Sequence, residues 1–182
     1  VLAVINVIGC TTQAGSPYPQ EINDTKVFTD IPADTIASVL SPGWNLGNQL
    51  EGVVVKTDAA AGISITYPSE TGYMATRITK ELLSEVKKAG FKFVRIPVSF
   101  FAYINDEDNY LINAVWMSRI QQVVDMCIDE GLYCMIDLHG DGYYTIKNSW
   151  LLCAEEEQKP IIEKYRAVWK QIALTFRDYD ES

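Results

Sequence analysis

The sequence predicts an α/β fold of the TIM type, in which only the first three β/α units of a (β/α)8 barrel are present. Strand-like apolar runs alternate with amphipathic helical segments in the order βαβαβα, which is typical of a parallel sheet. Polar residues stand towards the C-terminal part of each of the three strand-like runs, at Asn45, Arg95 and His139. The C-terminal ends of barrel strands carry the active site, so these residues are expected to face one common site.

The N-terminal part of the chain is expected to contribute a tether, a short helix and the first strand. Residues 10–33 are rich in Thr, Gln, Ser and Pro and predict a flexible linker. A short helix is predicted over 34–40 and an apolar strand over 43–47. Residues 48–74, rich in Gly, Ala, Ser and Thr, predict a long loop of the kind that carries function.

The first complete helix-and-strand unit is predicted over residues 77–98. A helix is expected over 77–89, ending at Gly90, because its apolar residues recur on one face. Those residues are Ile78, Leu82, Leu83 and Val86. Alternation in the strand 91–98 directs Val94 and Ile96 towards the helices and Arg95 towards the barrel mouth.

Two further helices and one strand complete the predicted order. A loop over 99–114 precedes a helix over 114–130, and a strand follows over 133–138. The apolar face of that helix comprises Trp116, Ile120, Val123, Val124, Cys127 and Ile128. A loop over 140–158 leads to a helix over 160–177. Its buried face is predicted to comprise Ile161, Tyr165, Val168, Ile172 and Phe176.

Length and charge limit the classes of protein to which the chain can belong. Its 182 residues, 48% hydrophobic and 21% charged, suffice for one core but fall short of the roughly 250 residues of a complete (β/α)8 barrel. The net charge of −9 argues against nucleic acid and anionic membrane surfaces as partners. The sequence shows no phosphate-binding loop, metal-ligand cluster or Ser-His-Asp arrangement, so no cofactor or metal is expected.

The first ten residues have the pattern of a lipoprotein signal. Residues 1–9 are mostly apolar, and Cys10 follows Val7-Ile8-Gly9, which resembles a bacterial lipoprotein box. We therefore expect a signal-peptide remnant over 1–9 and lipid on Cys10. The expected location is the bacterial cell envelope, at the outer membrane or cell surface, or outside the cell. The alternative is a short buried strand with an incidental cysteine. Cys127, Cys134 and Cys153 are interpreted as core residues.

Four motifs in order resemble glycoside hydrolase family 5, the cellulase family of clan A. They are Gly-Trp-Asn-Leu-Gly-Asn-Gln-Leu-Glu at 43–51, Gly-Phe-Lys-Phe-Val-Arg-Ile-Pro-Val-Ser at 90–99, Asp-Leu-His-Gly-Asp at 137–141 and the helix at 168–181. The resemblance places residues 34–182 in the N-terminal half of the catalytic barrel. Gly140 stands where the family commonly has a second histidine. The segment 70–73 lacks the Trp-Gly-Asn-Pro that usually follows in the family, which leaves subsite specificity open.

The resemblance implies two residues that support the active site. Arg95 matches the family arginine that hydrogen-bonds near the nucleophile carboxylate and keeps it ionised. His139, the single histidine of the chain, matches the histidine that contacts sugar hydroxyls. Asp137, two residues before it on the same face, is interpreted as an acceptor that supports the site.

Five further residues are candidates for substrate binding. Asn48 and Glu51 match residues that bind hydroxyls of more remote sugars, and Asn45 points to the same mouth. Capping of the loop is the alternative for Asn48 and Glu51. Tyr143 and Trp150 are expected to stack on sugar faces, with simple loop packing as the alternative.

The implied activity is that of a retaining endo-β-1,4-glucanase acting on β-glucan. Retention requires an acid/base and a nucleophile carboxyl about 5–5.5 Å apart. The family carries these glutamates on the fourth and seventh strands, so this chain is expected to be a truncated, inactive fragment that needs the missing C-terminal half of the barrel. The alternatives are a family member acting on mannan, xylan, xyloglucan or mixed-linkage glucan, and a non-catalytic surface glycan-binding protein.

Overall fold

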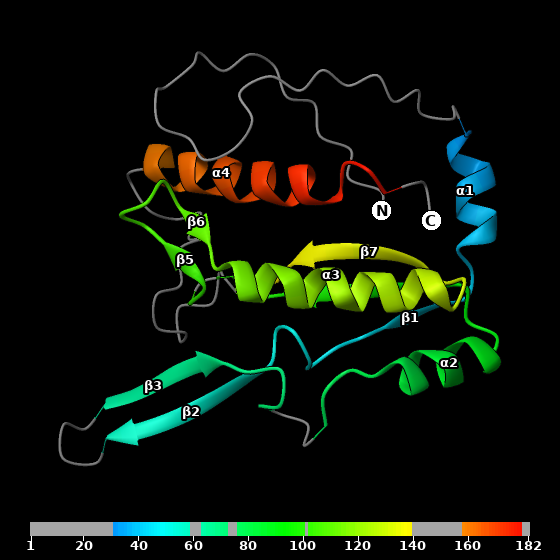
Figure 1. Cartoon of the computed structure of the whole chain (residues 1–182), viewed down its shortest axis with the longest axis horizontal. Helices are drawn as coiled ribbons and strands as arrows, with labels where there is room; N and C mark the ends of the chain where they lie inside the picture. Colours follow the sequence, from blue (N-terminus) through cyan, green and yellow to red (C-terminus); the bar gives the residue numbers. More distant parts are fainter. Residues whose placement is uncertain (1–30, 59–62, 73–75, 101, 140–157, 180–182) are drawn as a thin grey trace.

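A three-stranded parallel sheet organises the molecule. The computed structural model describes residues 31–58, 63–72, 76–100, 102–139 and 158–179 (Figure 1). Its central sheet has the order β1-β4-β7, with β1 at Gly43–Asn45, β4 at Phe93–Val98 and β7 at Tyr133–Leu138. Both strand pairs are parallel. The α/β class and the predicted parallel sheet are therefore confirmed.

Within the described ranges, four helices accompany the sheet, at Ala33–Val39 (α1), Lys80–Lys88 (α2), Ala114–Asp129 (α3) and Gln158–Phe176 (α4). Each lies within a few residues of its predicted range. α2 begins three residues later than predicted because Thr79 caps it, its hydroxyl accepting a hydrogen bond from the Leu82 amide at 3.3 Å. Asn113 caps α3, because its side-chain oxygen accepts hydrogen bonds from the backbone amides of Val115 and Trp116.

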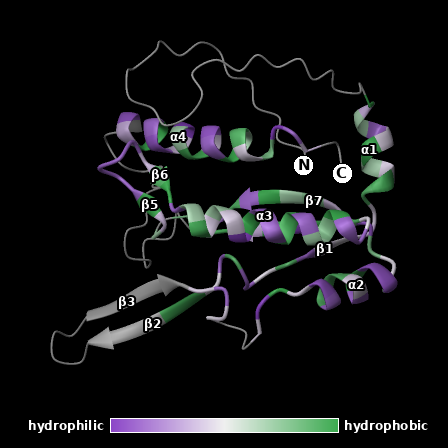
Figure 2. Ribbon diagram, viewed as in Figure 1, coloured by the Kyte–Doolittle hydropathy of each residue, from purple (hydrophilic) through white to green (hydrophobic). Residues whose placement is uncertain are grey.

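The core lies between the sheet and its helices. Val94 and Ile96 are fully buried, as predicted, and they belong to one hydrophobic cluster with the buried residues of α2 and α3. In Figure 2 green hydrophobic residues alternate with purple ones along α3, which is the pattern of a helix with one buried face. Cys127 and Cys134 are buried free thiols, which confirms their prediction as core residues. Among the described residues, none of the helices is both long and apolar enough to cross a membrane.

The expectation of a continuous loop over 48–74 is wrong. Val53–Asp58 (β2) and Ile63–Pro68 (β3) form an antiparallel pair that extends away from the central sheet (Figure 1). Both runs are rich in β-branched residues, which favour strands, whereas the Gly- and Ala-rich residues are concentrated between them. The expected loop over 99–114 likewise contains a short antiparallel pair, Ile104–Asn105 (β5) with Leu111–Ile112 (β6).

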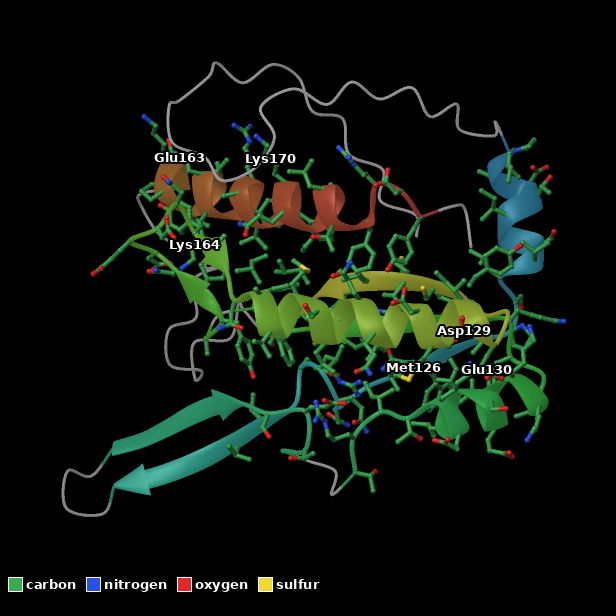
Figure 3. All side chains as sticks on the ribbon, in the orientation of Figure 1. Met126, Asp129, Glu130, Glu163, Lys164 and Lys170 are labelled. Carbon is green, nitrogen blue, oxygen red and sulfur yellow. The ribbon has the colours of Figure 1, made fainter. Side chains whose placement is uncertain are left out.

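The buried face of α4 differs from the prediction at Tyr165, whose exposed fraction is 40%. Val168, Ile172 and Phe176 are buried as predicted, and Lys164 joins them where Tyr165 was expected. Lys164 buries its aliphatic stem while its ammonium group reaches Asp106 at 2.7 Å. Figure 3 shows Lys164 on the side of α4 that faces the β5–β6 pair. Lys164 thus occupies a buried position of α4 that a search for apolar residues alone does not identify.

Candidate active site

Asn45, Arg95, Asp137 and His139 meet at the C-terminal edge of the central sheet, and we call them the strand-end cluster. Arg95 Nη1 donates to Asn45 Oδ1 at 2.6 Å. Arg95 Nη2 donates to Asp137 Oδ2 and lies 3.3 Å from His139 Nδ1. His139 Nδ1 lies 3.2 Å from Asp137 Oδ2. Three strands thus bring together four polar side chains that the sequence predicted to share one site.

The backbone around this cluster is held by strand-to-strand hydrogen bonds. Leu46 N donates to Arg95 O at 2.9 Å, and His139 N donates to Val98 O at 2.9 Å. Ser99, which is buried, donates its hydroxyl to His139 O at 2.6 Å. These bonds fix the ends of β1, β4 and β7 relative to one another, so the cluster rests on a rigid frame.

The loop that leaves β1 passes close to the cluster, and its sequence permits this. A Cβ at Gly47 would lie 2.6 Å from Asn45 Nδ2, which is closer than side-chain atoms pack. Glycine at this position therefore allows Asn45 to keep the side-chain position from which it accepts a hydrogen bond from Arg95.

The electrostatics of the cluster centre on one permanent cation. The guanidinium of Arg95 carries its charge at any accessible pH and presents a planar fork of donors. The Asp137 carboxylate lies against it, and both side chains are about one-third exposed, at 33% and 30%. Solvent therefore screens this ion pair, and its value lies in orientation more than in stability. The fork, the amide and the imidazole supply donors and acceptors of the kind that bind sugar hydroxyls.

Glu51 has a structural role in this conformation. Its carboxylate accepts hydrogen bonds from the backbone amides of Asn48 at 2.6 Å and Gln49 at 3.1 Å. This is the loop-capping alternative considered for Glu51. Asn48 is exposed and has a φ of 61°, in the left-handed region that asparagine tolerates. Neither side chain belongs to the strand-end cluster. Tyr143, Trp150 and Cys10 lie outside the described residues.

A second polar cluster, around Glu70, was not predicted from the sequence. Glu70 is 7% exposed and its carboxylate accepts from Arg119 Nη2 at 2.5 Å, Arg119 Nε at 3.0 Å and Arg77 Nε at 3.0 Å. It also accepts from the Ile78 amide at 2.9 Å. Burial by itself raises the pKa of Glu70. The hydrogen bonds and charge of Arg119, the Ile78 amide and Arg77 together outweigh burial and hold the pKa of Glu70 below the usual glutamate value.

The Glu70 cluster fastens the base of the β2–β3 pair to the frame. Glu70 follows β3, Ile78 precedes α2 and Arg119 belongs to α3, so three elements meet at one carboxylate. Gly72 packs directly on the backbone of Val53, where a Cβ would overlap main-chain atoms. The base of the β2–β3 pair is thereby tied to α3 and to the residues that precede α2.

The described residues contain no group of three His, Cys, Asp or Glu side chains placed to hold a metal ion. The strand-end cluster offers hydrogen bonds and one oriented cation.

Comparison with known proteins gives a consistent result. The family model described as Cellulase (glycosyl hydrolase family 5) matches residues 56–182. Endoglucanase A of Paenibacillus barcinonensis is 46% identical over 151 residues, which are 83% of this chain and 35% of that protein. The xyloglucan-specific endo-β-1,4-glucanase BoGH5A of Bacteroides ovatus is 33% identical, covering 87% of this chain and 30% of its own length. The chain spans about a third of the length of these curated relatives.

Solved structures agree with these matches. A family 5 xyloglucanase from Paenibacillus pabuli, solved in complex with ligand, is 48% identical and superposes with a TM-score of 0.68, covering 79% of this chain and 37% of its own. A broad-specificity endoglucanase from Clostridium acetobutylicum is 32% identical with a TM-score of 0.69, covering 83% of this chain and 40% of its own.

Proposed function

The chain belongs to glycosyl hydrolase family 5, and from this premise we propose that it forms one wall of the active site of a retaining endo-β-1,4-glucanase. The observation that carries the proposal is the strand-end cluster. Arg95 lies within the second strand of the parallel sheet and His139 directly follows the third, and their side chains meet at the end of the sheet where barrel enzymes place catalytic and binding groups. The substrate proposed is a β-1,4-linked glucan.

In this proposal the cluster binds and orients, and does not itself cleave the glycosidic bond. Arg95 stabilises the ionised form of a nearby catalytic carboxylate, because a fixed cation favours the charged state of an acid. Asn45 and His139 hydrogen-bond to hydroxyls of the sugar next to the scissile bond. Asp137 and Glu51 are already engaged, by Arg95 and by backbone amides respectively.

We further propose that the acid/base and nucleophile glutamates lie outside these 182 residues, on later strands of a complete (β/α)8 barrel. The resemblance to the family supports this, as does the share of its relatives that the chain covers. The C-terminal half of the barrel is then the partner that this chain requires.

Hydrolysis assays test both statements. The 182-residue chain alone is expected to release no reducing sugar from carboxymethyl-cellulose, whereas the protein with the rest of its barrel should. Proton NMR of the first products should show the β-anomer, since retention proceeds through two displacements. Turnover by the purified chain alone would place the catalytic pair within it, and an α-anomer would exclude the retaining mechanism.

Xyloglucan is the second candidate substrate. The 48% identical structure is a xyloglucanase, and BoGH5A is described as specific for xyloglucan. Comparing kcat/KM on tamarind xyloglucan, mixed-linkage glucan, mannan, xylan and carboxymethyl-cellulose separates the candidates. Binding without turnover by the complete protein on all five would favour a non-catalytic glycan-binding role.

Surface attachment through lipid on Cys10 is also proposed, on the strength of the apolar run followed by Gly9-Cys10. Mass spectrometry of the mature N-terminus after expression in a bacterium tests it. A diacylglyceryl mass on Cys10 is expected. An unmodified Cys10 within a longer mature chain would leave secretion as the alternative.

A further inference from the structure

The position of Asp137 Oδ2 between two nitrogen atoms constrains the protonation of His139. This oxygen accepts from Arg95 Nη2 and lies 3.2 Å from His139 Nδ1. A carboxylate oxygen has no hydrogen to donate, so its contact with Nδ1 is favourable only when Nδ1 carries the proton. An unprotonated Nδ1 would instead direct its lone pair at a negative oxygen.

Arg95 offers a competing arrangement, in which Nη2 donates to an unprotonated Nδ1 across 3.3 Å. The other contacts of Arg95 argue against it. Its Nη1 donates to Asn45 at 2.6 Å, and of the two Nη2 contacts the shorter is the one to the charged Asp137 carboxylate. A guanidinium gains more from a charged oxygen than from an imidazole nitrogen farther away. If Arg95 Nη2 and His139 Nδ1 both donate to Asp137 Oδ2, the two nitrogen atoms are also brought close to each other. This arrangement accounts for the Nη2–Oδ2, Nδ1–Oδ2 and Nη2–Nδ1 contacts together.

From this geometry we propose that Asp137 is a positioning residue that holds His139 as the Nδ1–H tautomer. The other ring nitrogen, Nε2, is then a hydrogen-bond acceptor. The two ring nitrogens of a neutral histidine have opposite roles, so fixing one fixes the other. The proposal rests on the proposed function for its ligand, a β-glucan whose hydroxyl donates a hydrogen bond to Nε2.

The hydrogen bonds of the His139 backbone restrict where its ring can lie, so the tautomer of the ring determines which ligand groups it can bind. The His139 main chain is held on both sides, by Val98 O and by the Ser99 hydroxyl, so the ring pivots only about its side-chain bonds. Asp137 removes part of that remaining freedom. The site then presents Arg95, which only donates, beside a histidine that accepts, a pairing suited to a sugar hydroxyl that must do both.

The first test reads the tautomer directly. Long-range ¹H–¹⁵N NMR of the protein labelled with ¹⁵N-histidine distinguishes the Nδ1–H form, the Nε2–H form and the doubly protonated ring. It is recorded under alkaline conditions, on the protein as naturally encoded with any flanking sequence. The His139 signals are assigned by their loss in His139→Gln. The Nδ1–H form is expected. A dominant Nε2–H form, or a doubly protonated ring, would overturn the proposal.

Three variants separate positioning from general structural support. Asp137→Asn, which offers an amide donor to Nδ1, should shift the ring to the Nε2–H form. Asp137→Glu, which keeps a carboxylate, should retain Nδ1–H at least in part. Asp129→Asn makes the same chemical change at an exposed ion pair with Lys80 and should leave the His139 signals unchanged. An Nδ1–H form that persists in Asp137→Asn would contradict the proposal, and the wild-type spectrum remains decisive if that variant does not fold.

The ligand arm is read separately. Titration with cellotetraose should perturb His139 Nε2 in the wild type, and Asp137→Asn should bind it roughly tenfold more weakly, the scale of one hydrogen bond. An Nδ1–H tautomer with no response to cellotetraose or a xyloglucan heptasaccharide would retain the role of Asp137 and refute the proposed glucan function. If Asp137→Asn shifts His139 to the Nε2–H form but binds cellotetraose as tightly as the wild type, the acceptor role of Nε2 is refuted.

Discussion

At the residue scale, Arg95 has the largest expected contribution to activity. It is a permanent cation held by Asn45 and Asp137 at the strand ends. In the protein that carries the complete barrel, Arg95→Ala should lower kcat by about 10²-fold or more, the scale of losing one oriented electrostatic group. Circular dichroism should show that the fold persists.

Arg166→Ala is the matched control for that measurement, since it removes an exposed arginine of α4. Its kcat should equal that of the wild type. If Arg95→Ala stays within a few-fold of the wild type on both xyloglucan and carboxymethyl-cellulose, Arg95 does not act in the reaction.

Glu70 is expected to govern stability in acid. Its folded-state pKa lies below the usual glutamate value, so its ionised form stabilises the fold above that usual value, and this stabilisation is lost as the pH falls through the folded pKa. Glu70→Gln should lower the free energy of unfolding by about 3 kcal/mol at pH 7, near the lower end for breaking a buried pair. The variant should lose less stability than the wild type on acidification below pH 4.5.

Urea unfolding at pH 7 and at pH values below 4.5 measures this. Glu85→Gln is the control, because Glu85 forms only an exposed ion pair with Lys88. Parallel pH dependence of wild type and Glu70→Gln would contradict the assignment of the lowered pKa to Glu70.

The sequence predicts some residues of the two polar clusters and not others, for physical reasons. Arg95 could be found because strand alternation determines the face to which its side chain points, and His139 because it directly follows a strand. The capping role of Glu51 depends on the conformation of the turn that follows β1. The sequence does not specify that conformation, so substrate binding and loop capping both remained possible. The pair Glu70–Arg119 joins residues 49 positions apart, and no local pattern specifies such a partner.

At the element scale, the regular elements of the sheet and core were the most predictable. Strand β7 has the predicted bounds of 133–138, because a run of apolar residues between Gly131 and polar residues admits little else. The β2–β3 pair was missed because the high Gly, Ala and Ser content of residues 48–74 obscured two β-branched runs. Composition averaged over a long window hides short strands.

The attachment of α4 to the rest of the molecule depends on a buried glutamine. Gln171 Oε1 accepts from the Ile112 amide at 2.8 Å, and its Nε2 donates to Tyr110 O at 2.8 Å. Gln171→Leu leaves two backbone groups without these partners, and we expect a loss of about 2–4 kcal/mol in the free energy of unfolding. Lys170→Leu, at an exposed position of the same helix, should change it by less than about 0.5 kcal/mol.

Denaturant unfolding, with amide hydrogen exchange at Ile112, measures that prediction. Exchange at Ile112 should accelerate in Gln171→Leu and not in Lys170→Leu. Equal stability of the two variants would show that Gln171 does not hold α4 against β6.

At the scale of the whole molecule, the described sheet has two outer strands. β1 and β7 each pair with β4 alone within the described part of the chain, and their other edges carry strand hydrogen-bonding groups. A complete (β/α)8 barrel closes such edges by pairing every strand on both sides. In the proposed barrel, further strands would pair with the outer edges of β1 and β7. The strand-end cluster would then lie at the C-terminal end of a closed sheet.

The central claim is that the strand-end cluster is the glycan-binding wall of a family 5 active site. The most direct test is a crystal structure of the naturally encoded protein with cellotetraose or a xyloglucan heptasaccharide. The account predicts sugar hydroxyls within hydrogen-bonding distance of Arg95, His139 or Asn45, with two carboxyl groups from later strands about 5–5.5 Å apart across the bound sugar. A ligand seated elsewhere, with the strand-end cluster remote from it, would contradict the account.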